Sequence, residues 1–199
     1  LEYSVVFTDR ALNHMSLAFQ GVMRDISRTL RRVYNAEEGA GVALVPGGGT
    51  YAMEAVARQL AHGKKVVVLR NGWFSYRWTQ IFEAGAIPAE SIVLKARQTP
   101  SDSGARQHPF QPVPVDEAVA VIEAERPDLI FAPHVETASG IMLPDGYMKA
   151  IADAAHRVGA LFVLDCIASG CVWVDMKAIG VDVLISAPQK GWSASPCSG

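Results

Sequence analysis

The stretch Ala160-Leu161-Phe162-Val163-Leu164-Asp165 decides the fold, because it is a continuous apolar run that ends in an acid. Such a run is typical of a strand that is covered on both faces of a parallel sheet. Similar runs predict strands at 41–45, 65–69, 91–94, 128–132, 160–164 and 182–186. Amphipathic stretches between them predict helices at 16–34, 50–62, 74–85, 115–125 and 146–158. This alternation predicts an α/β fold with a mainly parallel sheet and helices on both faces.

The composition excludes several classes of function. A chain of 199 residues can bury one large core, and we expect a single domain over residues 1–199. A net charge of -2 gives no field that would attract nucleic acid or anionic lipid, and no apolar run approaches the length of a membrane span. The three cysteines, Cys166, Cys171 and Cys197, have no metal-ligand spacing. We therefore expect no nucleic-acid, membrane or metal partner, and a reduced, cytoplasmic setting.

The two ends of the sequence indicate a piece of a longer protein. The chain begins at Leu1 without Met or a signal-peptide pattern, and it stops in the turn-rich segment 192–199. We expect it to be cut at both ends, with a C-terminal part missing.

Polar residues follow the predicted strands. In parallel sheets, ligands bind at the carboxyl ends of the strands, where loops and helix starts converge. The polar landmarks at these positions are Gly47-Gly48-Gly49-Thr50, Asn71-Gly72-Trp73-Phe74, His134-Val135-Glu136-Thr137, Asp165 and Lys190.

Lys190 and Asp165 form the pair that points to a chemistry. An enzyme that uses pyridoxal 5'-phosphate needs one amine to hold the aldehyde as a Schiff base and one carboxylate to keep the pyridine nitrogen protonated. Beside that positive charge Asp165 should stay ionised, whereas burial near it would keep Lys190 neutral part of the time for proton transfer. Strand alternation sends Asp165 and Ile167 to the same side, so that Ile167 could cover one ring face.

Other landmarks are compatible with the same cofactor. The glycines before Thr50 let the backbone approach an anion at a helix N-terminus, although a plain strand-to-helix turn could use the same glycines. Trp73 or Phe74 could stack on the ring, and either could instead be a packing residue. Thr137 can offer a hydroxyl to the phenolate oxygen of the cofactor. His134 is interpreted as a structural hydrogen-bonding residue rather than a general base, because no Ser-His-Asp order surrounds it.

Together these segments resemble the class V aminotransferases of pyridoxal-phosphate fold type I, and most closely the alanine-glyoxylate and serine-pyruvate aminotransferase group. The likeness runs over nearly the whole chain. The matching segments, in chain order, are Gly48-Gly49-Thr50-Tyr51-Ala52-Met53-Glu54, Asn71-Gly72-Trp73-Phe74, His134-Val135-Glu136-Thr137-Ala138-Ser139-Gly140, Asp165-Cys166-Ile167-Ala168-Ser169, 180–186 and Gln189-Lys190.

The resemblance implies a role for each matching residue. Gly48, Gly49, Thr50 and Gln189 would lie at the phosphate; Phe74 would stack on the ring; Thr137 would contact the phenolate oxygen; Asp165 would pair with the ring nitrogen; Ile167 would cover the other face; Lys190 would form the Schiff base. It also implies a homodimer, and a substrate-binding arginine in a C-terminal small domain that lies outside this chain. The shape of the turn at Pro188, where the family has a small residue nearby, is left open.

The activity implied is transfer of an amino group from alanine or serine to glyoxylate or pyruvate. One alternative is a lyase of the same fold, such as a cysteine desulfurase or a kynureninase-like enzyme; Gln189 before the lysine and the position of Cys197 argue against a desulfurase. Another is 2-aminoethylphosphonate transamination, and a third is a nucleotide-binding or ligand-sensing module in which Lys190 has no catalytic part.

Overall fold

The computed structural model describes residues 14–100, 108–194 and 199. The chain divides into two compact units, Leu1–Ala43 and Leu44–Gly199. Of the helices and strands described, the first unit holds α1 (Leu17–Val33) and the second holds the rest. The single domain expected over residues 1–199 stays a prediction, and Cys197 lies outside the described residues.

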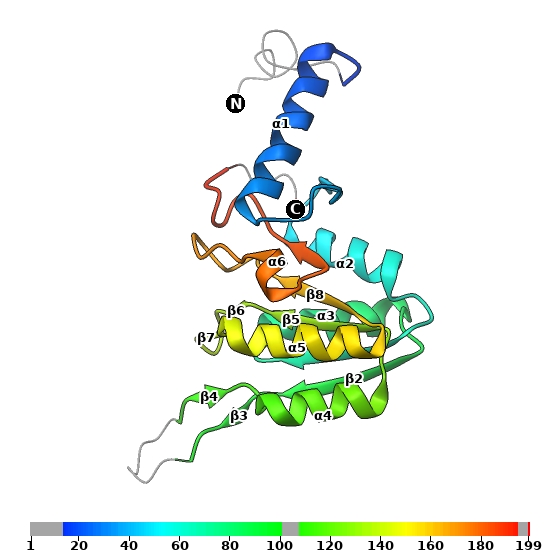
Figure 1. The fold of residues 1–199 in the computed structure, drawn as a ribbon, viewed down its shortest axis with the longest axis vertical. Coiled ribbons are helices and arrows are strands. Elements are labelled where there is room, and N and C mark those ends of the chain that lie inside the picture. The colour runs from blue at the N-terminus through cyan, green and yellow to red at the C-terminus, as the bar shows by residue number, and fades with distance from the viewer. Residues whose placement is uncertain (1–13, 101–107, 195–198) are drawn as a thin grey trace. The chain divides into compact units, whose positions relative to one another are not determined.

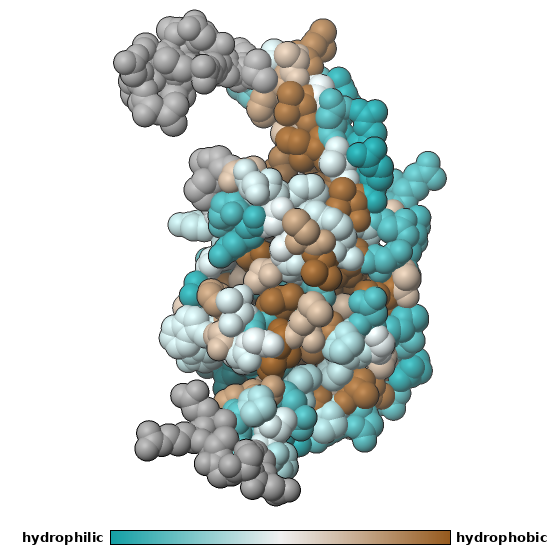
Figure 2. Space-filling model, turned by 90° about the vertical axis from the view of Figure 1, so that its left-hand side faces the viewer, coloured by the Kyte–Doolittle hydropathy of each residue, from teal (hydrophilic) through white to brown (hydrophobic). Residues whose placement is uncertain are grey.

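Helix α1 is amphipathic and begins at a side-chain cap. The hydroxyl of Ser16 accepts the Phe19 N–H at 3.1 Å, and Arg31 and Arg32 lie in the last turn, where positive charge complements the helix dipole. None of its residues is buried. Figure 2 shows apolar residues along one side of this helix and hydrophilic residues along the other.

The second unit is built around one parallel sheet (Figure 1). Its strand order is β2-β1-β5-β8-β9, and each neighbouring pair is parallel. The bounds of these strands are Lys65–Arg70 for β1, Glu90–Lys95 for β2, Leu129–Pro133 for β5, Leu161–Asp165 for β8 and Val183–Ile185 for β9. The register sets Pro133 opposite Asp165 and Asp165 opposite Ile185, so that these strand ends lie at the same edge.

Helices cover both faces of the sheet. Side chains at alternate positions of a strand point to opposite faces, and in β8 Phe162 and Leu164 join one core whereas Val163 joins the other. Helices α4 (Val115–Glu125), α5 (Asp145–Val158) and the short α6 (Met176–Ile179) pack in the first core. Helices α2 (Gly49–Leu60) and α3 (Trp73–Gly85) pack in the second. The predicted α/β fold with a mainly parallel sheet is confirmed.

Two short hairpins lie outside the main sheet. Strand β3 (Arg97–Gln98) pairs with β4 (Phe110–Gln111), and β6 (Val135–Glu136) pairs with β7 (Ile141–Met142), both antiparallel. The strand predicted at 41–45 is wrong. Val45 instead exchanges two backbone hydrogen bonds with Gly199, each 2.9 Å long, so this apolar run has no partner strand among the described residues.

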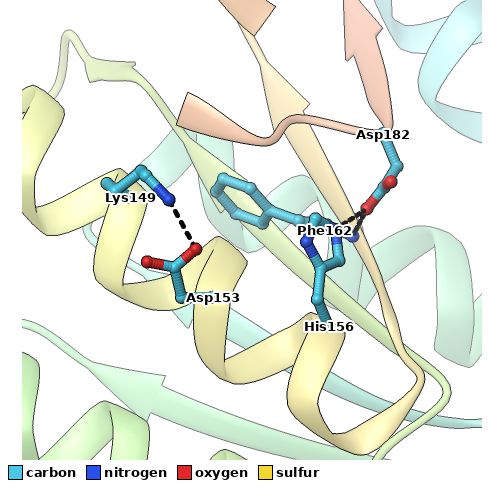
Figure 3. Close-up of polar contacts among 5 residues, drawn as sticks. All are labelled: Lys149, Asp153, His156, Phe162 and Asp182. Atoms are coloured by element: carbon cyan, nitrogen blue, oxygen red, sulfur yellow. Dashed lines mark hydrogen bonds and ion pairs between the residues drawn. The ribbon is translucent and has the colours of Figure 1, made fainter. Parts of the chain in front are cut away.

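At the amino edge of the sheet, Asp182 joins three elements (Figure 3). Its carboxylate accepts the N–H of Phe162, at the start of β8, at 2.7 Å and lies 2.9 Å from Nε2 of His156 in α5. On the outer side of α5, Lys149 and Asp153 form an ion pair one turn apart. Asp182 is therefore a structural carboxylate at the amino edge of the sheet.

Within residues 14–100 and 108–194, no helix combines the length and apolarity needed to cross a bilayer. In the same ranges, no three His, Cys, Asp or Glu side chains group in a way that could hold a metal ion.

Candidate active site

A pocket of about 150 Å³ lies at the carboxyl edge of the sheet. The end of β8, the first turns of α2 and α3, the β6 segment and the loop after β9 all contribute to its wall. The lining residues are Gly49, Thr50, Met53, Phe74, Arg77, Val135, Thr137, Asp165, Ile167, Ala168, Gln189 and Lys190. The structure therefore brings together every site residue predicted from the sequence except Gly48, which is adjacent to the wall as the N-cap of α2.

The N-terminus of α2 faces this pocket through Gly49 and Thr50. No side chain caps the helix at Gly48, and the first N–H groups of a helix have no acceptor within it. A Cβ on Gly49 would lie 2.5 Å from Cδ1 of Ile167, so a larger residue at position 49 would have to displace the Ile167 side chain. This end of the pocket can take an anion.

Asp165 is the buried acid of the pocket. Its carboxylate accepts the N–H of Ile167 at 2.9 Å, which fixes the turn after β8. Burial raises its pKa to about 6; the hydrogen bond from Ile167 opposes that shift, and the nearby Glu136 carboxylate adds to it. A cation placed against Asp165 would relieve both unfavourable effects. The carboxylate is therefore set to meet positive charge.

Lys190 lies on the same pocket, but it is exposed rather than buried. The burial expected for it is therefore wrong, since the loop after β9 carries both Gln189 and Lys190 at the surface. Within the described residues its amine makes neither a hydrogen bond nor an ion pair, with Asp165 or any other group. The next residue is held tightly, because a Cβ on Gly191 would lie 2.2 Å from the carbonyl oxygen of Gly170.

The structure distinguishes the two aromatic candidates. Phe74 lines the pocket. Trp73 is 57% exposed, its ring centroid lies 5.9 Å from that of Tyr76, and it does not line the pocket. Phe74 is therefore the aromatic side chain available to a ring bound in the pocket.

His134 is a structural residue, as interpreted from the sequence. It is buried, its Nδ1 lies 2.8 Å from the Ser169 hydroxyl, and it does not line the pocket. Burial lowers its pKa, although Asp145 opposes the shift.

Sequence reasoning missed two functional candidates, Arg77 and Glu136. Arg77 lines the pocket, and its Nη1 donates to Thr50 Oγ1 at 3.2 Å. A signal for it existed, because Arg77 is three residues after Phe74 in a predicted helix and such residues share a face. Glu136 is completely buried and contacts α3 rather than the pocket. Nothing in the sequence distinguishes it from an exposed acid, since three of its four hydrogen bonds come from Phe74 and Ser75, 62 and 61 residues away.

The chain is similar to known aminotransferases. It is 27% identical to L-aspartate–glyoxylate aminotransferase of Paracoccus denitrificans, over 93% of this chain and 44% of the relative. It is 28% identical to 2-aminoethylphosphonate–pyruvate transaminase of Syntrophobacter fumaroxidans, over 86% of this chain and 43% of the relative. The solved structure of alanine–glyoxylate aminotransferase from Nostoc sp. superposes with a TM-score of 0.75 at 28% identity, over 94% of this chain and 46% of that one.

This chain thus spans less than half the length of these relatives. The sequence profile of aminotransferase class V matches residues 2–195, nearly the whole chain. The strand ends and helix starts that form the pocket all fall within the matched range. The chain therefore belongs to the class V aminotransferase family.

Proposed function

We propose that this chain forms the cofactor-binding part of a pyridoxal-phosphate-dependent aminotransferase. One observation carries the proposal: Asp165 and Lys190 lie on one pocket without forming an ion pair, and the pocket also has a helix N-terminus and an aromatic side chain. A planar cofactor that carries both a phosphate anion and a cationic ring needs these four features together. The family named above gives independent support.

The residues present fit this cofactor. When bound, pyridoxal 5'-phosphate supplies an aldehyde that an amine can hold and a protonated ring that withdraws electrons. Thr50, Gln189 and the backbone at Gly48 and Gly49 would hold the phosphate. Phe74 and Ile167 would hold the two faces of the ring, and Thr137 would donate to the phenolate oxygen.

Two side chains would carry the chemistry. The Asp165 carboxylate would hold the proton at the ring nitrogen, and the contact would in turn keep Asp165 ionised. The Lys190 amine would hold the aldehyde carbon and, once the amino donor has displaced it, would accept the proton that leaves the donor's Cα.

For substrates we propose alanine or serine as amino donor and glyoxylate or pyruvate as acceptor, in a homodimer in the cytoplasm. Relatives named for glyoxylate support the acceptor. A relative named for 2-aminoethylphosphonate and pyruvate supports a second candidate with the same chemistry and a different donor.

The test uses the purified full-length protein with pyridoxal 5'-phosphate. We expect a visible absorbance band, a covalent adduct after borohydride reduction, and loss of the band when alanine is added, with pyruvate as the product. Loss of the band with 2-aminoethylphosphonate but not alanine or serine would favour the second candidate. Absence of both band and adduct would contradict the proposal, and release of ammonia or sulfide would indicate a lyase.

Arg77 gives a prediction at the phosphate end. Arg77→Gln should weaken cofactor binding about tenfold, because it removes a charged donor beside Thr50. The loss should shrink as salt is added, since the side chain is only partly buried. Absorbance titration with pyridoxal 5'-phosphate measures the dissociation constant.

Arg58→Gln is the matched control, because Arg58 lies in the last turn of α2 and pairs with Glu54 outside the pocket. Equal affinity of the two variants would show that Arg77 has no part in holding the anion.

A further inference from the structure

Glu136 has no exposed surface, and its carboxylate accepts hydrogen bonds from four donor groups. Its Oε1 accepts the N–H of Phe74 at 3.1 Å and that of Ala138 at 3.2 Å. Its Oε2 accepts the N–H of Ser75 at 2.8 Å and the Ser75 hydroxyl at 2.7 Å. Every donor therefore meets an oxygen, and an ionised carboxylate is the side chain that can accept from all four.

The network extends through Ser75 to the chain before α3. The Ser75 hydroxyl accepts the N–H of Asn71 at 2.8 Å and that of Gly72 at 3.0 Å. The turn from β1 into α3 is thus tied to Glu136 by one side chain. Buried networks of this kind specify one arrangement when all members are satisfied.

Close packing also fits Glu136 to the start of α3. A Cβ on Gly72 would lie 2.6 Å from Cγ of Glu136 and 2.7 Å from its Cδ. A side chain at position 72 would therefore displace Glu136, whose own side chain is fully buried.

Glu136 joins two walls of the pocket without lining it. Val135 and Thr137, its neighbours in the chain, line the pocket, whereas its own side chain turns to α3. On the α3 side, the residues it holds by their backbone are Phe74, a lining residue, and Ser75. The carboxylate therefore fixes the aromatic wall relative to the wall that carries Thr137.

We propose that Glu136 is a positioning residue that holds Phe74 in place over the cofactor ring. The inference rests on the function proposed above. Glu136 acts at the N-terminus of a helix, where a negative charge and its acceptor oxygens stabilise the free N–H groups of the first turn. Phe74 is the second residue of that helix, so its ring position depends directly on this anchor.

Glu136→Gln keeps the volume but replaces one oxygen by an NH₂ group, which cannot accept. Two donors on one side of the side chain then lose their acceptor, and the first turn of α3 is released. We expect pyridoxal 5'-phosphate to bind about tenfold more weakly, and a similar loss for Phe74→Ala. Because both changes remove the same contact, cofactor affinity in the double variant should fall about tenfold and not about a hundredfold.

Asp182→Asn is the matched control. Asp182 is also a carboxylate that accepts a backbone N–H (Figure 3), but it is not among the residues that line the pocket. Asp182→Asn should lower the melting temperature and change cofactor affinity less than about twofold, because Asp182 contacts neither of the two pocket walls that Glu136 joins. If Glu136 acted in folding alone, Glu136→Gln would behave like Asp182→Asn, with a lower melting temperature and nearly unchanged cofactor affinity.

The outcomes separate the two proposals. A wild-type chain without a borohydride-trapped adduct contradicts the proposed function, and the role of Glu136 falls with it. A wild-type adduct with unchanged affinity in Glu136→Gln, or with losses that multiply in the double variant, overturns only the role of Glu136. If Glu136→Gln does not fold, Ser75→Ala replaces it in the comparison of single and double variants. Ser75→Ala should weaken cofactor binding about threefold, and it should cause no further weakening when combined with Phe74→Ala.

Discussion

We expect Lys190→Ala to abolish the borohydride-trapped adduct and to lower the rate of amino transfer from alanine at least about 10³-fold. The physical reason is that a methyl group can neither hold the aldehyde carbon nor accept the proton from the donor's Cα, and positioned proton transfer alone contributes about 10²- to 10⁴-fold. Mass spectrometry after borohydride reduction locates the adduct, and single-turnover absorbance gives the rate.

Lys149→Ala is the control for this result, because Lys149 pairs with Asp153 on α5 (Figure 3) and is not among the residues that line the pocket. It should keep both adduct and rate. Lys190→Arg adds a second check, since it keeps a positive charge at the pocket but cannot form the covalent bond at neutral pH. A trapped adduct in Lys190→Ala, or one at another lysine, would refute the assignment of the reacting amine.

The sheet and the pocket edge could be predicted from apolar runs, because a strand buried on both faces needs a continuously apolar sequence. The run 160–165 indicated both β8 and the acid at its end, and strand register then sets Asp165 beside Pro133 and Ile185. The run 41–45 looks the same but forms no strand, because a strand also needs a partner and the Val45 backbone hydrogen-bonds only to Gly199 among the described residues.

The parts of the site that sequence could not predict depend on contacts over long separations. The choice between Trp73 and Phe74 depends on the rotation of α3, which Glu136 fixes from 62 residues away. The exposure of Lys190 depends on how the loop after β9 lies against Gly170. Neither follows from residue type or periodicity, whereas the spacing of Arg77 from Phe74 did carry usable information.

Asp165→Asn should lower the rate of amino transfer while raising the stability of the cofactor-free protein. Amino transfer is expected to fall about 10²- to 10³-fold, because an amide cannot hold the ring nitrogen protonated and that charge stabilises the transition state. Without cofactor, the same variant should be more stable than the wild type above pH 6, since it no longer buries a carboxylate.

The sign of the pH dependence follows from the raised pKa. Asp165 has a pKa of about 6 in the fold against 3.8 as its ordinary value, so between these values the folded chain holds a proton that the unfolded chain has lost. The free energy of unfolding of the cofactor-free wild type therefore falls as pH rises from about 4 to 6, by an amount on the order of a few kcal/mol. Asp165→Asn should lack this fall and equal the wild type below about pH 4.

Chemical denaturation of the cofactor-free proteins from pH 4 to 8 measures the effect. Asp182→Asn should be less stable than the wild type, because its carboxylate already accepts a backbone N–H and its charge is partly solvated. Saturating pyridoxal 5'-phosphate should reverse the order of wild type and Asp165→Asn above pH 6, since the bound cation compensates the buried charge only where a carboxylate is present. If Asp165→Asn were less stable at every pH and cofactor did not change the order, Asp165 would be a structural acid and not the partner of a cationic ring.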